Sequence, residues 1–174
     1  KKWQILISTI ISAQTRDETT IRVCETLFKK YPSMKKLAKA RESSIKKLIR
    51  KSNYHKTKSK NILVVAKMLS NKKIPDNLKD LIKLPGVGRK VANVYLAEAH
   101  NANTIGVDTH VARISFKLGW TNSRNPQKIE KDLERLFPEK YWIQINKTMV
   151  IFGKNFGRSK RREDKILENL IKKV

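Results

Sequence analysis

The sequence is poor in cysteine and in long apolar runs, and each shortage excludes a class of protein. A single cysteine, Cys24, leaves no partner for an internal disulfide and no set of thiolates for a metal cluster. Cys24 falls in the apolar phase of its segment, so we expect it in the core. No apolar run approaches the ~20 residues that a membrane-spanning helix needs, and no signal peptide is evident. The chain starts at Lys1 rather than Met, which is consistent with a preceding segment.

Acidic residues are also scarce, with 15 against 40 lysines and arginines, so the formal net charge is +25. Self-repulsion of this size does not stabilise a compact chain, so the excess predicts a polyanionic partner. Basic residues gather at 46–60 and 154–162, although each run alone is typical of a solvated helix face. An anionic membrane is the weaker alternative to nucleic acid, because no segment pairs a basic face with a large apolar one.

The apolar residues recur with helical spacing, and strand-type alternation is nearly absent, so the sequence predicts about ten helices and an all-α fold. Residues 125–126 (Asn-Pro) predict an N-cap followed by a proline in the first helical turn. A polar stretch at 100–104 predicts the boundary between two helical blocks.

Residues 84–90, which read Leu-Pro-Gly-Val-Gly-Arg-Lys, lie between two of the predicted helices. Gly86 and Gly88 permit a tight turn without a Cβ, and the amides of this turn, with those of the helix that starts at Arg89, form an anion site. Such a site suits a phosphate. The alternative is an ordinary tight connection between two helices.

Lys90 and Asp108 add an amine and a carboxylate to this anion site. An amine there can attack a sugar C1′ and form a Schiff base. Asp108 precedes a predicted helix, so it can cap that helix and can stabilise positive charge on a deoxyribose as the base leaves. The alternatives are a phosphate-contacting or solvated Lys90 and an Asp108 that only caps.

Several segments in the same order resemble the endonuclease III branch of the helix–hairpin–helix DNA glycosylase superfamily. They are residues 10–17 (Ile-Ile-Ser-Ala-Gln-Thr-Arg-Asp), 84–94 and 107–110 (Val-Asp-Thr-His). The resemblance covers nearly the whole chain and implies two helical lobes with a DNA-binding cleft between them. Residues 1–101 would form a helical-barrel lobe, with the helix–hairpin–helix at about 77–99, and residues 102–174 the lobe that carries the catalytic aspartate.

The resemblance implies that Lys90 is the Schiff-base nucleophile and Asp108 its carboxylate partner. Gln14 would fill the space left by a flipped nucleotide, and Tyr54 would act as an intercalating wedge. Otherwise Gln14 is a polar helix-end residue and Tyr54 a core residue. Asn53 replaces a glycine of the family, and because asparagine tolerates left-handed backbone we expect the turn to survive. The implied DNA contacts are Gln14, Tyr54, Gly86, Gly88, Arg89, His110, Arg158 and Lys160.

His110 is equally consistent with a structural residue. The resemblance further implies a monovalent cation at the main-chain carbonyls of Ile82, Leu84 and Val87. Most of the branch carries four C-terminal cysteines that bind an iron–sulfur cluster, but residues 152–162 contain none. We therefore expect no iron–sulfur cluster and no other cofactor. We expect the hydrophobic helix at 166–171 to close the lobe in place of a cluster.

These observations predict a monomeric base-excision-repair DNA glycosylase with AP lyase activity on oxidised pyrimidines and abasic sites in double-stranded DNA. We expect it inside the cell with the DNA, in the cytoplasm or nucleoid if prokaryotic. One alternative is a mismatch uracil/thymine or oxidised-purine glycosylase of the same fold. The other is a non-catalytic helix–hairpin–helix DNA-binding protein, against which the pairing of Lys90 with Asp108 argues.

Overall fold

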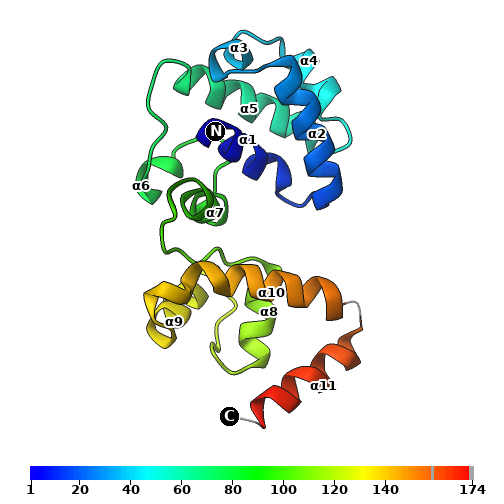
Figure 1. The fold of residues 1–174 in the computed structure, drawn as a ribbon, viewed down its shortest axis with the longest axis vertical. Helices are drawn as coiled ribbons and strands as arrows, with labels where there is room; N and C mark the ends of the chain where they lie inside the picture. The colour runs from blue at the N-terminus through cyan, green and yellow to red at the C-terminus, as the bar shows by residue number, and fades with distance from the viewer. Residues whose placement is uncertain (158, 173–174) are drawn as a thin grey trace. The chain divides into compact units, whose positions relative to one another are not determined.

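The computed structural model describes residues 1–157 and 159–172, and most of this part of the chain is helical (Figure 1). The described residues form eleven α-helices and one 3₁₀ turn, joined by loops, and contain no strand, so the all-α prediction is confirmed. Among these helices none is long and apolar enough to cross a membrane. The chain divides into two compact units, Lys1–Asn101 and Ala102–Val174.

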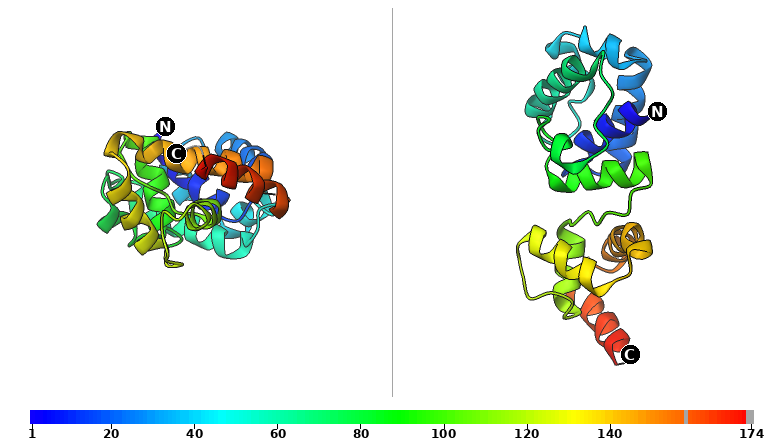
Figure 2. Two further views of the ribbon diagram at one scale, coloured as in Figure 1. Left: turned by 90° about the horizontal axis from the view of Figure 1, so that it is seen from below. Right: turned by 90° about the vertical axis from the view of Figure 1, so that its left-hand side faces the viewer.

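The first unit is built around its first helix, α1, which packs against α2, α5 and α7, while α3 and α4 pack on α5. Figures 1 and 2 show α1, in dark blue, enclosed by the other helices of this unit. The apolar face of α1 and Cys24 of α2 are buried in the core, as the sequence predicts. The helices are α1 (Lys2–Ser12), α2 (Asp17–Lys30), α3 (Met34–Ala38), α4 (Glu42–Leu48), α5 (His55–Leu69), α6 (Leu78–Leu81) and α7 (Arg89–His100).

The second unit places α8 against both α9 and α10, and α11 against α10. One apolar cluster joins them, with Val111 and Ile114 of α8, Leu133 of α9 and Met149 of α10 among its buried members. The elements are α8 (Thr109–Lys117), α9 (Pro126–Leu136), the 3₁₀ turn η1 (Glu139–Tyr141), α10 (Trp142–Phe156) and α11 (Lys160–Ile171).

Several helix boundaries follow from short-range capping. Asn125 caps α9 by accepting hydrogen bonds from the amides of Gln127 and Lys128, and Pro126 opens the helix, as predicted. The short helix α3, which apolar spacing did not predict, begins at a Ser33 cap that accepts from the Lys36 amide. Its five residues are too few to show a helical period.

The last helix, α11, joins the second unit by a route that its apolar pattern did not predict. Leu167 is buried in the apolar cluster, but Leu170 is 50% exposed. Among the side chains of α11 that the structure describes, the other buried one is that of Glu163, whose carboxylate binds Arg113 and Lys117 of α8. The expectation of a purely hydrophobic closure was therefore incomplete, because a buried carboxylate shares the attachment with Leu167.

Candidate active site

The two glycines of the hairpin have different structural roles. Gly86 has a left-handed backbone with φ +78°, and a Cβ there would lie 2.8 Å from Nδ2 of Asn61 on α5. Gly88 has an extended backbone that any residue adopts, and a Cβ there would meet no atom within 4 Å. Gly86 is therefore required by the turn, whereas Gly88 leaves open space at the N-terminus of α7. The turn itself is closed by the Val87 amide, which donates to the Leu84 carbonyl at 3.1 Å.

Lys90 is the second residue of α7 and is half-buried. The residues that follow it, Val91 and Ala92, are buried, and α7 packs on α1, which fixes the position of the first turn. Within the described part of the chain, no side chain caps α7. The first-turn amides of an α-helix have no hydrogen-bond acceptor within the helix, and the helix dipole favours an anion at this end. The open side of Gly88 and the side chain of Lys90 thus belong to one anion-accepting helix end.

Asp108 caps α8 in the second unit, as its sequence position predicts. Its Oδ1 accepts hydrogen bonds from the amides of His110 and Val111, both at 2.9 Å. Because both bonds use Oδ1, the cap leaves Oδ2 able to face another group.

His110 lies in a notch that Gly153 of α10 provides. A Cβ on Gly153 would lie 2.1 Å from Nδ1 of His110, so only glycine allows this contact. The same Nδ1 lies 3.5 Å from Nη2 of Arg113, one turn further along α8. His110 is therefore packed in place close after the Asp108 cap, which supports the hypothesis that it is a structural residue. Its predicted contact with DNA remains a prediction.

Gln14 and Tyr54 are brought together by the first unit. Both have left-handed backbones with φ 55°, and both are exposed, Tyr54 by 65%. The alternative of a core tyrosine is therefore wrong. Asn53 does not take the left-handed conformation that we expected of it. Its side chain instead donates to the Gln14 carbonyl, which ties the two loops to each other.

A basic hollow of about 220 Å³ lies in the first unit. It is lined by α2 and by the end of α4, and it includes Lys51, three residues before Tyr54 in the sequence. Most of its charged lining is cationic: Arg22, Lys47, Arg50 and Lys51 against one acid, Glu18. This surface suits a polyanion.

The remaining predicted contacts are only partly described. Arg158 lies outside the described residues, and so does the side chain of Lys160, although its backbone opens α11. Arg89 is the first residue of α7. The Leu84 carbonyl accepts the Val87 amide and retains a second lone pair. The monovalent cation at the carbonyls of Ile82, Leu84 and Val87 remains a prediction. Among the described residues no group of histidine, cysteine and acidic side chains is suited to bind a metal ion.

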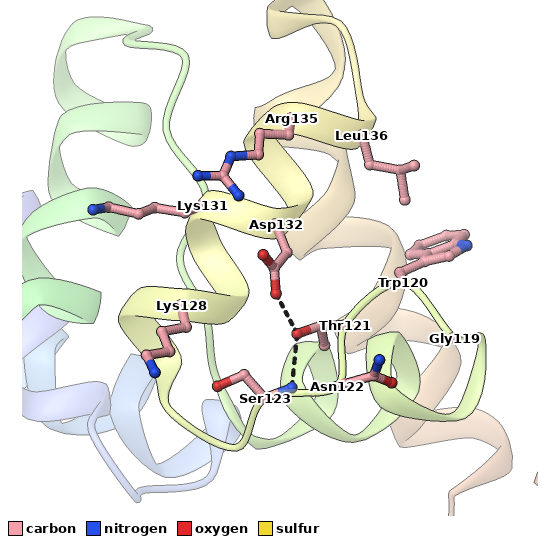
Figure 3. Close-up of a pocket in the computed structure, with 10 residues that line it drawn as sticks. All are labelled: Gly119, Trp120, Thr121, Asn122, Ser123, Lys128, Lys131, Asp132, Arg135 and Leu136. Atoms are coloured by element: carbon pink, nitrogen blue, oxygen red, sulfur yellow. Dashed lines mark hydrogen bonds between the residues drawn. The ribbon is translucent and has the colours of Figure 1, made fainter.

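A second hollow, of about 830 Å³, lies in the second unit (Figure 3). It is lined by the loop after α8 and by α9, whereas Asp108 caps the opposite end of α8. Asp132 lies in the hollow and accepts a hydrogen bond from Thr121 Oγ1 at 2.6 Å. Its size alone does not connect it to the chemistry of Lys90 or Asp108.

Comparison with known proteins agrees with this geometry. Residues 7–139 match the model of the HhH-GPD superfamily, described as a base excision DNA repair protein. Endonuclease III of Thermotoga maritima is 41% identical over 155 residues, which are 87% of this chain and 73% of that protein. Endonuclease III of a Synechocystis species is 36% identical, with 87% and 71% covered.

Solved structures give the same result. A trapped endonuclease III–DNA covalent intermediate superposes with a TM-score of 0.87 and 31% identity, covering 92% of this chain and 77% of that chain. A non-covalent endonuclease III–DNA complex superposes with a TM-score of 0.84 and 32% identity, covering 88% and 74%. The chain thus belongs to the HhH-GPD superfamily of base excision DNA repair proteins. Within that superfamily it is an endonuclease III-like DNA glycosylase.

Proposed function

We propose that this protein removes oxidised pyrimidines from double-stranded DNA and cleaves the resulting abasic site, with Lys90 and Asp108 as its catalytic residues. The observation that supports this most is the position of Lys90 in the first turn of α7, directly after the open side of Gly88. A cation in the first turn of a helix is unfavourable for stability, because it faces the positive end of the dipole. A lysine that binds or attacks a substrate explains its presence there.

In the proposed reaction the phosphate of the damaged nucleotide binds at the N-terminus of α7, which brings the sugar to Lys90. The neutral amine of Lys90 attacks C1′, and the C1′–N bond to the base breaks with its electron pair leaving on the base. Asp108 stabilises the positive charge that develops on the sugar, through the carboxylate oxygen that does not cap α8. Of the two protons on the attacking amine, one goes to the departing base and the other to O4′ as the sugar ring opens, which leaves an imine between Lys90 and C1′. Loss of the C2′ proton to water then breaks the C3′–O bond on the 3′ side, and its electron pair leaves with the 3′ phosphate.

Two side chains of the first unit are proposed to open the duplex. Gln14 fills the space of the extruded nucleotide, and Tyr54 stacks between bases. Arg89, His110, Arg158 and Lys160 are proposed to add DNA contacts. A monovalent cation on the hairpin carbonyls would supply charge next to the bound phosphate.

We further propose that the protein works as a monomer, inside the cell, without an iron–sulfur cluster or other cofactor. The support is the sequence itself, since its single cysteine is buried in α2 and a cluster needs several thiolates. Iron content measured on protein purified without oxygen tests this proposal. An iron–sulfur absorption band with stoichiometric iron would overturn it.

Borohydride trapping on abasic DNA tests the assignment of Lys90. Wild type is expected to form a covalent adduct, and Lys90→Ala is expected to form none. The control Lys67→Ala removes an exposed lysine of α5 and is expected to form as much adduct as wild type. No adduct from wild type would exclude the Schiff base and favour a glycosylase that only removes bases, or a DNA-binding protein. A panel of duplexes then tests the substrate, because preferential release of uracil or thymine from mismatches, or of oxidised purines, would favour the alternative glycosylases.

A further inference from the structure

Lys58 of α5 is a buried lysine inside a strongly basic surface segment. Its residue surface is 6% exposed, whereas Lys56 and Lys60 on the same helix are exposed. Its ammonium donates hydrogen bonds to the carbonyls of Ile11 and Ala13 at 2.6 and 2.7 Å, and to Thr15 Oγ1 at 3.0 Å. These three acceptors match the three N–H donors of a charged lysine.

The acceptors lie at and just beyond the C-terminus of α1. Ile11 is in the last turn of this helix and Ala13 is its C-cap, so Lys58 binds carbonyls that the helix itself leaves without partners. The negative end of the helix dipole favours a cation there. Burial lowers the pKa of Lys58 to about 8, so the charged form still dominates at neutral pH.

This contact also reaches the loop of Tyr54. Thr15 Oγ1 accepts both from Lys58 and, at 3.2 Å, from the Asn53 amide. The Asn53 side chain in turn donates to the Gln14 carbonyl. A continuous set of bonds thus runs from Lys58 through Thr15 and Asn53 to the backbones on which Gln14 and Tyr54 are mounted.

Both of those backbones are strained. A left-handed conformation costs a residue other than glycine about 1–2 kcal/mol, and such residues persist where surrounding contacts over-determine them. Gln14 and Tyr54 both adopt this conformation, and both are exposed. The bonds from Lys58 and Asn53 join the two loops close to both of these residues.

We propose that Lys58 is a positioning residue that holds Gln14 and Tyr54 together in the conformation that opens the DNA duplex. The proposal rests on the function proposed above. Lys58 itself is buried and touches neither base nor sugar. Without its ammonium, the end of α1 and the Thr15 hydroxyl lose their common partner, so the two side chains no longer enter the duplex as one rigid pair.

The test separates duplex opening from chemistry. A duplex carries a tetrahydrofuran abasic-site analogue, which cannot form a Schiff base, with 2-aminopurine as its neighbour. At saturating wild-type protein the fluorescence is expected to rise several-fold as the base unstacks. Lys58→Met is expected to give less than a third of that rise at saturation. The control Lys60→Met removes an exposed lysine of the same helix and is expected to give the full rise. A full rise with Lys58→Met would overturn the proposal.

Thr15→Val keeps the proposal testable if Lys58→Met does not fold. It removes the shared oxygen at nearly constant volume, and we expect it to lose at least half of the fluorescence rise while its melting temperature stays close to wild type. A full rise with Thr15→Val would then count against the proposal. If wild type itself gives no rise, the duplex-opening part of the proposed function fails, which is a different result from failure of Lys58 alone.

Discussion

Replacing Glu163 by glutamine tests how the last helix is attached to the second unit. The carboxylate is 1% exposed and receives three charge-assisted hydrogen bonds. Arg113 donates side-on, from Nε to one oxygen at 2.9 Å and from Nη2 to the other at 2.7 Å, and Lys117 donates at 2.7 Å. Such a bidentate pair is among the stronger ion contacts in proteins.

The magnitude follows from how the cations are placed. Removing one member of a buried ion pair costs about 3–5 kcal/mol, because the remaining charge is left without compensation. The side chains of Arg113 and Lys117 are 37% and 21% exposed, and Lys117 keeps its pair with Asp164. Both cations regain water more easily than a fully buried one, so we expect Glu163→Gln to lose about 3 kcal/mol. For a unit of this size, that lowers the melting temperature by roughly 12–24 °C.

The stability lost in Glu163→Gln is expected to depend on pH. The guanidinium of Arg113 holds the pKa of Glu163 below its usual value. The stabilisation is therefore complete above the ordinary glutamate pKa, about 4.3, and is lost as the pH falls through the lower value of the folded protein. The gap between wild type and Glu163→Gln should narrow below about pH 4, and the glutamine variant should lack this dependence.

Urea unfolding at pH 7 and at pH 3, with hydrogen exchange of the α11 amides, measures both effects. Glu168→Gln is the matched control, since Glu168 lies on the same helix and is exposed. It should change stability by less than about 0.5 kcal/mol. A Glu163→Gln variant as stable as this control at pH 7, or a gap that persists unchanged in acid, would refute the reasoning.

Four further changes separate structural from functional roles. Asp108→Asn should keep the melting temperature within about 2 °C, because asparagine caps a helix as well as aspartate does. Base release by this variant in single-turnover assays should nevertheless fall at least tenfold. Unchanged release would show that Asp108 is a helix cap and not a catalytic residue. Gly86→Ala should destabilise the protein in thermal unfolding, because its backbone is left-handed and a Cβ would meet Asn61. Gly88→Ala should unfold like wild type but bind DNA several-fold more weakly, and equal binding would argue against a phosphate at this position. Gly153→Ala should lower both stability and base release, because the new Cβ falls 2.1 Å from His110 Nδ1, and unaltered release would show that this contact is dispensable.

Local rules made much of the fold predictable. Helical spacing gave the fold class, and the Asn125 and Asp108 caps follow from side chains that bond amides two and three residues away. Interactions within one turn of helix need no knowledge of the tertiary structure. Cys24 is buried for the same reason, since its place in the apolar phase of α2 decides its environment.

Long-range pairing was not predictable from spacing. Glu163 and Arg113 are 50 residues apart, so no local pattern reports their contact. Lys58 lies in a run of lysines that is typical of a solvated face, yet its ammonium donates to the carbonyl of Ile11 in α1, 47 residues earlier in the chain. The left-handed residue of its loop is Tyr54 rather than Asn53, because the Asn53 side chain is used to bond Gln14.

The positions that break local rules are also the positions to which we assign function. A chain selected only for stability would place glycine or asparagine where Gln14 and Tyr54 have left-handed backbones. The two residues together forfeit about 2–4 kcal/mol, a large share of the 5–15 kcal/mol that holds a typical domain folded. Lys90 adds a cation at the wrong end of a helix dipole. Such exceptions persist where the side chain itself is needed. Because the bonds from Lys58 and Asn53 join the end of α1 to the loop of Tyr54, we infer that the protein maintains the conformation for the sake of two exposed side chains and the DNA they meet.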